Sequence, residues 1–319
     1  MRAFHISHKG EAPRLLDIAK PNPTPGDLLI EIKACGLNFA DLLMIKGTYQ
    51  ETPELPFTLG MEVAGVVRGF GANTDGFEIG QRVAVFGGQG GLADFGVFPA
   101  DRAMVIPDGM TFEQAAAFPI AYGTSHLALE YRADLQPNET LVVLGAAGGV
   151  GLTAVEIGKK MGARVIAVAR GAEKLAIARA AGADHLIDAE VGDLRQALLD
   201  LGGVDVVYDP VGGDGFTSAF RACNPEARIL TIGFASGEVP QIKANHLLVK
   251  NINVIGFYWG GYMRFNPEIL LNSLRTLAGW IAQGTVTPHI SNVLPLTEAA
   301  VGLELLRTRN ATGKVVITP

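Results

Sequence analysis

The chain has 319 residues, 48% of them hydrophobic and 18% charged, and its formal net charge is −6. This composition is typical of a folded globular protein with one or two domains, and it excludes a disordered or fibrous chain. Lys and Arg are scattered rather than clustered, which argues against nucleic acid as a partner.

The chain shows no sign of membrane insertion or of secretion. Its longest uncharged stretch, residues 276–297, carries prolines and polar residues throughout, so no membrane span is expected. The first residues, MRAFHISHKG, alternate like a strand and lack the apolar core of a signal peptide. Only two cysteines are present, far apart and outside any C-x-x-C pattern. A cytoplasmic protein without a cysteine-based zinc site is predicted.

The first 115 residues predict a β-rich, barrel-like domain. Short strand-like segments are separated by turns rich in Pro and Gly: RAFHI, LLIEIKA, EVAGVVRGF and QRVAVFG. After the second of them comes ACGLNFAD, residues 34–41. Cys35 is interpreted as a small buried side chain at a strand end.

From Glu139 the pattern changes to alternating strands and helices. Six apolar segments separated by helical or turn segments indicate a parallel six-stranded sheet covered on both faces, which is a doubly wound α/β domain: LVVLG, RVIAVA, HLID, VDVVYD, RILTIGF and NINVIGF. Two further helices, around 267–284 and 296–307, precede a final strand, KVVITP. We expect this last part to return to the amino-terminal domain.

The first strand of the α/β half runs into GAAGGVG, residues 145–151. Gly148 would let the backbone approach a pyrophosphate, and Gly151 would let the next helix pack closely on the strand. The helix that begins at Val150 would direct free N–H groups at the anion. Ala146 stands where G-x-G-x-x-G has its first glycine. A glycine-rich turn without a ligand is the alternative, but the strand–helix repeat favours a dinucleotide site.

The end of the second strand indicates which dinucleotide is bound. NAD sites place an acid there to hold the ribose hydroxyls, but this position is Ala169. Arg170 follows, and Lys174 lies one turn into the next helix. A guanidinium binds a 2′-phosphate in a bidentate way, so NADPH is predicted. The alternative is that both cations are ordinary surface residues.

ACGLNFAD, GMEVAGVV, LGAAGGVG and GKVVITP together resemble the medium-chain dehydrogenase/reductase superfamily, and within it the zinc-independent quinone oxidoreductases related to zeta-crystallin. The resemblance implies a GroES-like catalytic domain, residues 1–117 and 263–319, and a Rossmann NADPH-binding domain, residues 118–262. It also implies an active-site cleft between them and a homodimer formed through the cofactor domain.

The zinc branch of this superfamily has metal ligands that the chain lacks. Where its pattern C-G-x-C-H-x-D has the second Cys and the His, this chain has Asn38 and Phe39, and Met61 replaces the His of G-H-E. Neither Asn nor Met is a usual zinc ligand, so no metal is expected. Without a Lewis acid, the hydride acceptor must itself be electron-poor, such as a quinone or an α,β-unsaturated carbonyl.

The resemblance assigns two catalytic residues. It places Asn38 beside the nicotinamide as a hydrogen-bond donor; from the residues alone, Asn38 could equally be the N-cap of FADLLMIKG with Asp41 as its partner. Tyr49 would offer its hydroxyl to the substrate, with rim packing as the alternative. Leu43 replaces a second tyrosine found in some relatives, which fits a more apolar substrate.

The remaining expected cofactor contacts come from several segments. Thr124 resembles a threonine near the nicotinamide, residues after two later strands would use their backbone, and Asn310 would close over the cofactor. The full predicted set is Thr124, Gly148, Gly149, Val150, Arg170, Lys174, Gly233, Phe234, Phe257, Tyr258 and Asn310.

The predicted function is therefore a zinc-independent, NADPH-dependent oxidoreductase that reduces a small quinone or enone. One alternative is an enoyl-thioester reductase on the same fold. Another is an NADPH-binding, crystallin-like protein with little turnover.

Overall fold

A computed structural model describes residues 1–8, 10–190 and 192–319. By packing, the chain forms two compact units. The first consists of Met1–Ile120 with Ala278–Pro319, and the second of Ala121–Leu277. The sequence assigned residues 267–284 to the catalytic domain, whereas packing divides helix α10 (Pro267–Ala282) between the two units.

The first unit is built on two sheets. The smaller has the order β2-β1-β4, from β1 (Arg2–Ile6), β2 (Arg14–Asp17) and β4 (Phe57–Thr58). The larger has the order β15-β16-β3-β5-β6-β8, with β7 also paired to β3. Its strands are β3 (Asp27–Gly36), β5 (Glu62–Phe70), β6 (Arg82–Val85), β7 (Phe95–Pro99), β8 (Ala103–Val105), β15 (Ile290–Pro295) and β16 (Lys314–Thr318).

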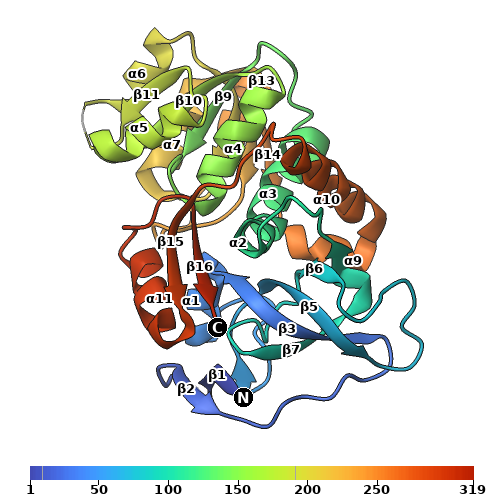
Figure 1. The fold of residues 1–319 in the computed structure, drawn as a ribbon. Coiled ribbons are helices and arrows are strands. Elements are labelled where there is room, and N and C mark those ends of the chain that lie inside the picture. The colour runs from blue at the N-terminus through green and yellow to red at the C-terminus, as the bar shows by residue number, and fades with distance from the viewer. Residues whose placement is uncertain (9, 191) are drawn as a thin grey trace. The chain divides into compact units, whose positions relative to one another are not determined.

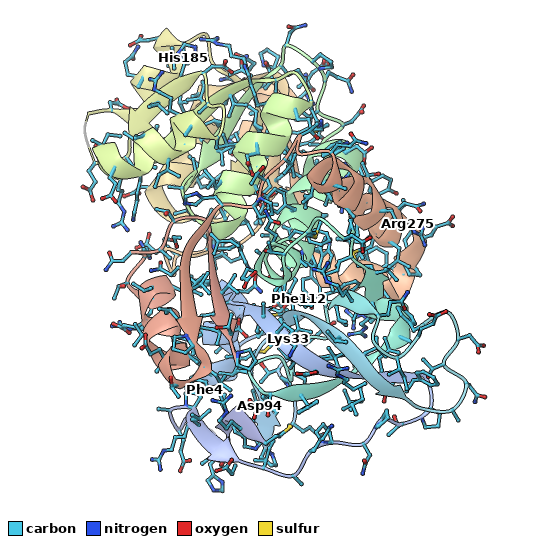
Figure 2. The ribbon with its side chains drawn as sticks, in the orientation of Figure 1. Phe4, Lys33, Asp94, Phe112, His185 and Arg275 are labelled. Carbon is cyan, nitrogen blue, oxygen red and sulfur yellow. The ribbon has the colours of Figure 1, made fainter. Side chains whose placement is uncertain are left out.

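Strand β1 is joined to the segment that precedes β7. Phe4 N donates to the carbonyl of Leu92 at 2.7 Å, and Arg2 forms an ion pair with Asp94. Phe4 and Asp94 accordingly lie in the same part of the unit (Figure 2). The small sheet is therefore part of the same core as the large one.

The end of the chain completes the large sheet. Strand β16 runs antiparallel to β3, with Ile317 opposite Cys35, and Figure 1 shows it beside β3. The helices of this unit include α1 (Phe39–Lys46), α2 (Phe112–Ala117) and α11 (Ala299–Arg307). Helix α11 packs on α1. The expected return of the tail to the amino-terminal domain is confirmed, and it brings Lys314 to the end of β3.

The second unit contains the predicted six-stranded parallel sheet, in the order β11-β10-β9-β12-β13-β14. Its strands are β9 (Thr140–Leu144), β10 (Arg164–Ala169), β11 (His185–Asp188), β12 (Val204–Asp209), β13 (Cys223–Thr231) and β14 (Asn253–Gly256). Its helices include α3 (Pro119–His126), α4 (Gly149–Lys160), α5 (Ala172–Ala180), α6 (Leu194–Asp200), α7 (Gly213–Ala222), α8 (Ala244–Lys250) and α9 (Tyr262–Phe265).

Both faces of this sheet are covered, as a buried parallel sheet requires. All five residues of β9 are buried. On one face Val142 belongs to the same core as Phe216 of α7. On the other, a β-carbon on Gly158 of α4 would lie 2.4 Å from Leu141. Among the described residues, no helix is both long and apolar enough to cross a membrane.

Candidate functional site

The turn between β9 and α4 is a tight glycine turn. Gly145 directly follows β9 and has φ +62°, a left-handed conformation that favours glycine. It therefore supplies the sharp turn that Ala146 cannot. A β-carbon on Gly151 would lie 2.2 Å from the carbonyl oxygen of Gly145. The predicted role of Gly151 in close packing thus has a direct steric reason.

Gly148 is the N-cap of α4, and nothing in the chain itself requires a glycine there. Its φ is −79°, and the closest atom to an added β-carbon is the carbonyl oxygen of Gly145, at an ordinary 3.4 Å. The first turn of α4, which includes Gly149 and Val150, has no charged side chain. Open space and free helix N–H groups fit a pyrophosphate.

The end of β10 fits a 2′-phosphate. Ala169 is its last residue, and the side chain of Arg170 is 44% exposed. The nearest acid is the exposed Glu190, whose carboxylate lies 3.9 Å from the guanidinium. Such a distant pair leaves the guanidinium available to an anion. Lys174 lies half-buried in the first turn of α5.

The other predicted cofactor residues are divided between the two units. In the second unit, Gly233 and Phe234 follow β13, and Phe257 and Tyr258 follow β14. They therefore lie at the same carboxyl edge of the sheet as Gly148 and Arg170, where open α/β sheets bind ligands. Thr124 is buried in α3. Asn38, Tyr49 and Asn310 belong to the first unit.

A buried ion pair lies at the junction of β3, β5 and β16. The ammonium of Lys314 is 2.7 Å from Glu62 Oε1, and it also donates to the carbonyl of Leu37 at 2.7 Å and to Asn38 Oδ1 at 2.8 Å. Glu62 Oε2 accepts from the backbone N–H of Ile120 at 2.8 Å. The Glu62 side chain is fully buried and that of Lys314 is 3% exposed. A buried charge pair is tolerated only when its atoms are hydrogen-bonded in this way.

Asn38 is held by this pair. Its Nδ2 donates to Glu62 Oε1 at 2.9 Å and to the carbonyl of Gly36 at 3.3 Å, while its Oδ1 accepts from Lys314. Both amide hydrogens therefore point at protein oxygens. Of the two contacts, the longer one to Gly36 is the easier to exchange for a substrate oxygen.

The capping interpretation of Asn38 agrees with the structure. Asn38 is the N-cap of α1, and its backbone N–H donates to Asp41 Oδ2 at 2.8 Å. Asp41 Oδ1 also accepts from Gly60 N at 3.2 Å. Burial raises the pKa of Asp41 to about 6. Its carboxyl thus ties the start of α1 to the loop before Glu62.

Cys35 is the small buried side chain that the sequence predicts. It is 1% exposed and unpaired, and burial raises the pKa of its thiol well above the ordinary value. Tyr49 is half-buried and packs on the core of the first unit. Residues on both sides of Tyr49 in the chain help to line a cavity of about 210 Å³. Its lining is mainly apolar and includes Ile6, Met44 and Phe57.

Sequence reasoning missed Lys314 and Glu62 as site residues. A lysine at the start of an apolar strand, KVVITP, was the available signal. Its partner is 252 residues away, so only the pairing of β16 with β3 reveals the contact. In the described part of the chain, no three His, Cys, Asp or Glu side chains are grouped so that they could hold a metal ion.

Comparison with known proteins agrees with the two-unit fold. Residues 24–108 match the model of the alcohol dehydrogenase GroES-like domain, and residues 149–273 match the zinc-binding dehydrogenase model. Quinone oxidoreductase-like protein 2 of Bos taurus is 37% identical over 311 residues, which cover 96% of this chain and 89% of the relative.

Solved structures agree in fold over the whole chain. Escherichia coli quinone oxidoreductase, complexed with NADPH, has a TM-score of 0.91 at 29% identity, covering 100% of this chain and 99% of its own. The quinone oxidoreductase of Thermus thermophilus, solved alone and with NADPH, has a TM-score of 0.88 at 31% identity, with both chains fully covered. The chain therefore belongs to the medium-chain dehydrogenase/reductase superfamily, in its zinc-independent, quinone oxidoreductase-like branch.

Proposed function

We propose that this protein reduces a quinone or an α,β-unsaturated carbonyl with NADPH and without a metal ion. The observation that carries the proposal is the open turn at Gly148 together with the Arg170 guanidinium, both at the carboxyl edge of one sheet. The structural neighbours solved with NADPH support the same cofactor. When bound, NADPH supplies the hydride.

The residues of the first unit argue for metal-free chemistry. Two side-chain oxygens here, Asn38 Oδ1 and Glu62 Oε1, already accept hydrogen bonds from the Lys314 ammonium. Charge that develops on the acceptor's oxygen must then be stabilised by hydrogen-bond donors. We propose Asn38 Nδ2 and the Tyr49 hydroxyl for this role, with Tyr49 also a candidate proton donor.

The proposal is tested by NADPH oxidation with 1,4-naphthoquinone and with a small enone, in buffer that contains a strong chelator. We expect turnover with at least one acceptor and no change on adding zinc. A crotonyl thioester of coenzyme A serves as the competing substrate. Faster turnover of the thioester would favour an enoyl-thioester reductase, and NADPH binding without turnover of any acceptor would favour a binding protein.

We also propose a homodimer formed through the second unit. Among the described strands, β14 pairs only with β13, so one edge of the sheet is open. The segment before it exposes large apolar side chains, with Leu248 at 78% and Val249 at 76%. An open strand edge beside exposed apolar residues is suited to pairing with a second copy of the chain.

The two buried, unpaired cysteines support our proposal that the protein works in the cytoplasm.

A further inference from the structure

Three hydroxyl groups are buried together inside the second unit. Ser125 lies on α3, Thr153 on α4 and Tyr208 on β12; Ser125 and Tyr208 are fully buried, and Thr153 is 3% exposed. Ser125 Oγ lies 2.7 Å from Thr153 Oγ1 and 2.9 Å from the Tyr208 hydroxyl. The group therefore joins three elements through a single serine.

The group also forms hydrogen bonds to the first turn of α4. The carbonyl oxygen of Val150 lies 3.0 Å from Ser125 Oγ and 2.9 Å from Thr153 Oγ1. A hydroxyl donates one hydrogen and accepts up to two. Tyr208 can donate to Ser125 while Ser125 donates to Val150. The single hydrogen of Thr153 is then shared among Ser125, Val150 and the carbonyl of Ala121, which is 3.2 Å away.

These bonds act on the part of α4 that would face an anion. The carbonyl of Val150 and the N–H of Gly151 belong to the same peptide group. A carbonyl that accepts hydrogen bonds polarises its own peptide, which makes the N–H a stronger donor. Because the first turn of α4 has no charged side chain, backbone N–H groups are its only donors to a phosphate.

The cluster is not needed merely to fill the core. Buried hydroxyls are unfavourable unless bonded, and apolar residues of similar shape pack about as well when both partners are replaced. Ala, Val and Phe would fit the positions of Ser125, Thr153 and Tyr208. The placement of hydroxyls against one backbone carbonyl of the glycine turn therefore points to a role beyond packing.

We propose that Ser125, supported by Thr153, is a positioning residue for cofactor binding. It fixes and polarises the Val150–Gly151 peptide so that the first turn of α4 is aimed at the pyrophosphate of NADPH. The inference rests on the proposed use of this turn for NADPH. It concerns binding affinity, and it is independent of which acceptor the protein reduces.

The test compares Ser125→Ala with Tyr208→Phe. Each variant deletes one buried hydroxyl of the cluster, but of these two residues only Ser125 contacts the Val150 carbonyl. Binding of NADPH is measured by titration calorimetry, and stability by thermal unfolding. We expect Ser125→Ala to raise the Kd for NADPH about tenfold, the effect of about one lost hydrogen bond, and Tyr208→Phe to stay within about twofold.

A second ligand separates local from general effects. Adenosine 2′-monophosphate carries the 2′-phosphate but no pyrophosphate, so its Kd should be the same in wild type and in Ser125→Ala. If Ser125→Ala folds poorly because the Tyr208 hydroxyl is orphaned, the double variant Ser125→Ala/Tyr208→Phe removes both groups and should still bind NADPH weakly. Thr153→Val should weaken NADPH binding in the same direction.

Two results would overturn this inference but leave the proposed function standing. One is an unchanged Kd for NADPH in Ser125→Ala and in the double variant, with only the thermal stability lowered. The other is an equal loss of affinity for NADPH and for adenosine 2′-monophosphate. A wild-type protein that binds no NADPH would instead overturn the proposed function, and this inference with it.

Discussion

We propose Arg170 as the residue on which the preference for NADPH over NADH depends. Its guanidinium is half-exposed at the end of β10, with its nearest carboxylate 3.9 Å away. A 2′-phosphate there would gain a charge-assisted, bidentate interaction that NADH cannot offer. Hydrogen bonds of this kind contribute about 1.5–3 kcal/mol, which corresponds to a difference of about ten- to a hundredfold in affinity.

We therefore expect Arg170→Ala to raise the Kd for NADPH at least about tenfold and to leave the Kd for NADH within about twofold. Fluorescence titration with both nucleotides measures this directly. Arg179→Ala is the matched control, because Arg179 is an exposed arginine in the last turn of the neighbouring helix α5. Equal weakening of both nucleotides by Arg170→Ala would contradict the assignment.

For Asn38, the sequence predicts the local backbone contact but not the surroundings of the side chain. Its neighbours correctly predict an N-cap, because the bond between its backbone and Asp41 is local. Its side-chain environment depends on Glu62 and Lys314, which lie 24 and 276 positions away. No local pattern reports such contacts. A role for Asn38 toward the substrate stays a prediction.

At the scale of elements, helices α3 and α4 are joined by a carboxyl group with an unusual pKa. The hydroxyl of Tyr122 donates to Glu156, and burial raises the pKa of Glu156 to about 7 in spite of that bond. In the unfolded chain the same carboxyl has an ordinary, lower pKa. Between about pH 4.5 and 7 this carboxyl thus binds more protons in the folded state than in the unfolded state, and its contribution to stability falls as pH rises.

Glu156→Gln keeps an acceptor for Tyr122 and removes this titration. We expect the variant to be about equal to wild type near pH 5 and more stable by up to about 3 kcal/mol at pH 8. Urea unfolding at both pH values gives the comparison. Because all other groups are shared, the difference between the two proteins isolates Glu156. Parallel pH dependence of the two proteins would show that Glu156 does not titrate in this range.

The elements themselves were largely predictable from sequence. All six predicted strands of the parallel sheet are confirmed. They were predictable because continuous apolar segments that alternate with helices are typical of buried parallel strands. Helix α7 was missed because it begins at Gly213, which directly follows Gly212, and both have positive φ. Phe216, Ala219 and Phe220 are spaced as on one face of a helix. The glycines and the turn-like GDG before them hid this pattern.

At the scale of the whole molecule, the open edge of β14 and the exposed side chains before it predict self-association. We expect light scattering to give a mass twice the 33.6 kDa of one chain. Leu248→Glu should shift the protein toward monomer, because it places a charge on the exposed apolar surface. Val301→Glu is the control, a half-exposed apolar residue in the first unit. A monomeric wild-type protein would refute the dimer.

The pairing of β16 with β3 has a consequence for biosynthesis. The second unit is continuous in the chain and can fold as soon as it leaves the ribosome. The first unit cannot, because Glu62 emerges 252 residues before the lysine that neutralises it. Until then, a carboxylate destined for complete burial has no cation beside it. Residues 1–120 therefore complete their unit only after β16 has been made, and we expect chains truncated before β16 to leave this unit unfinished.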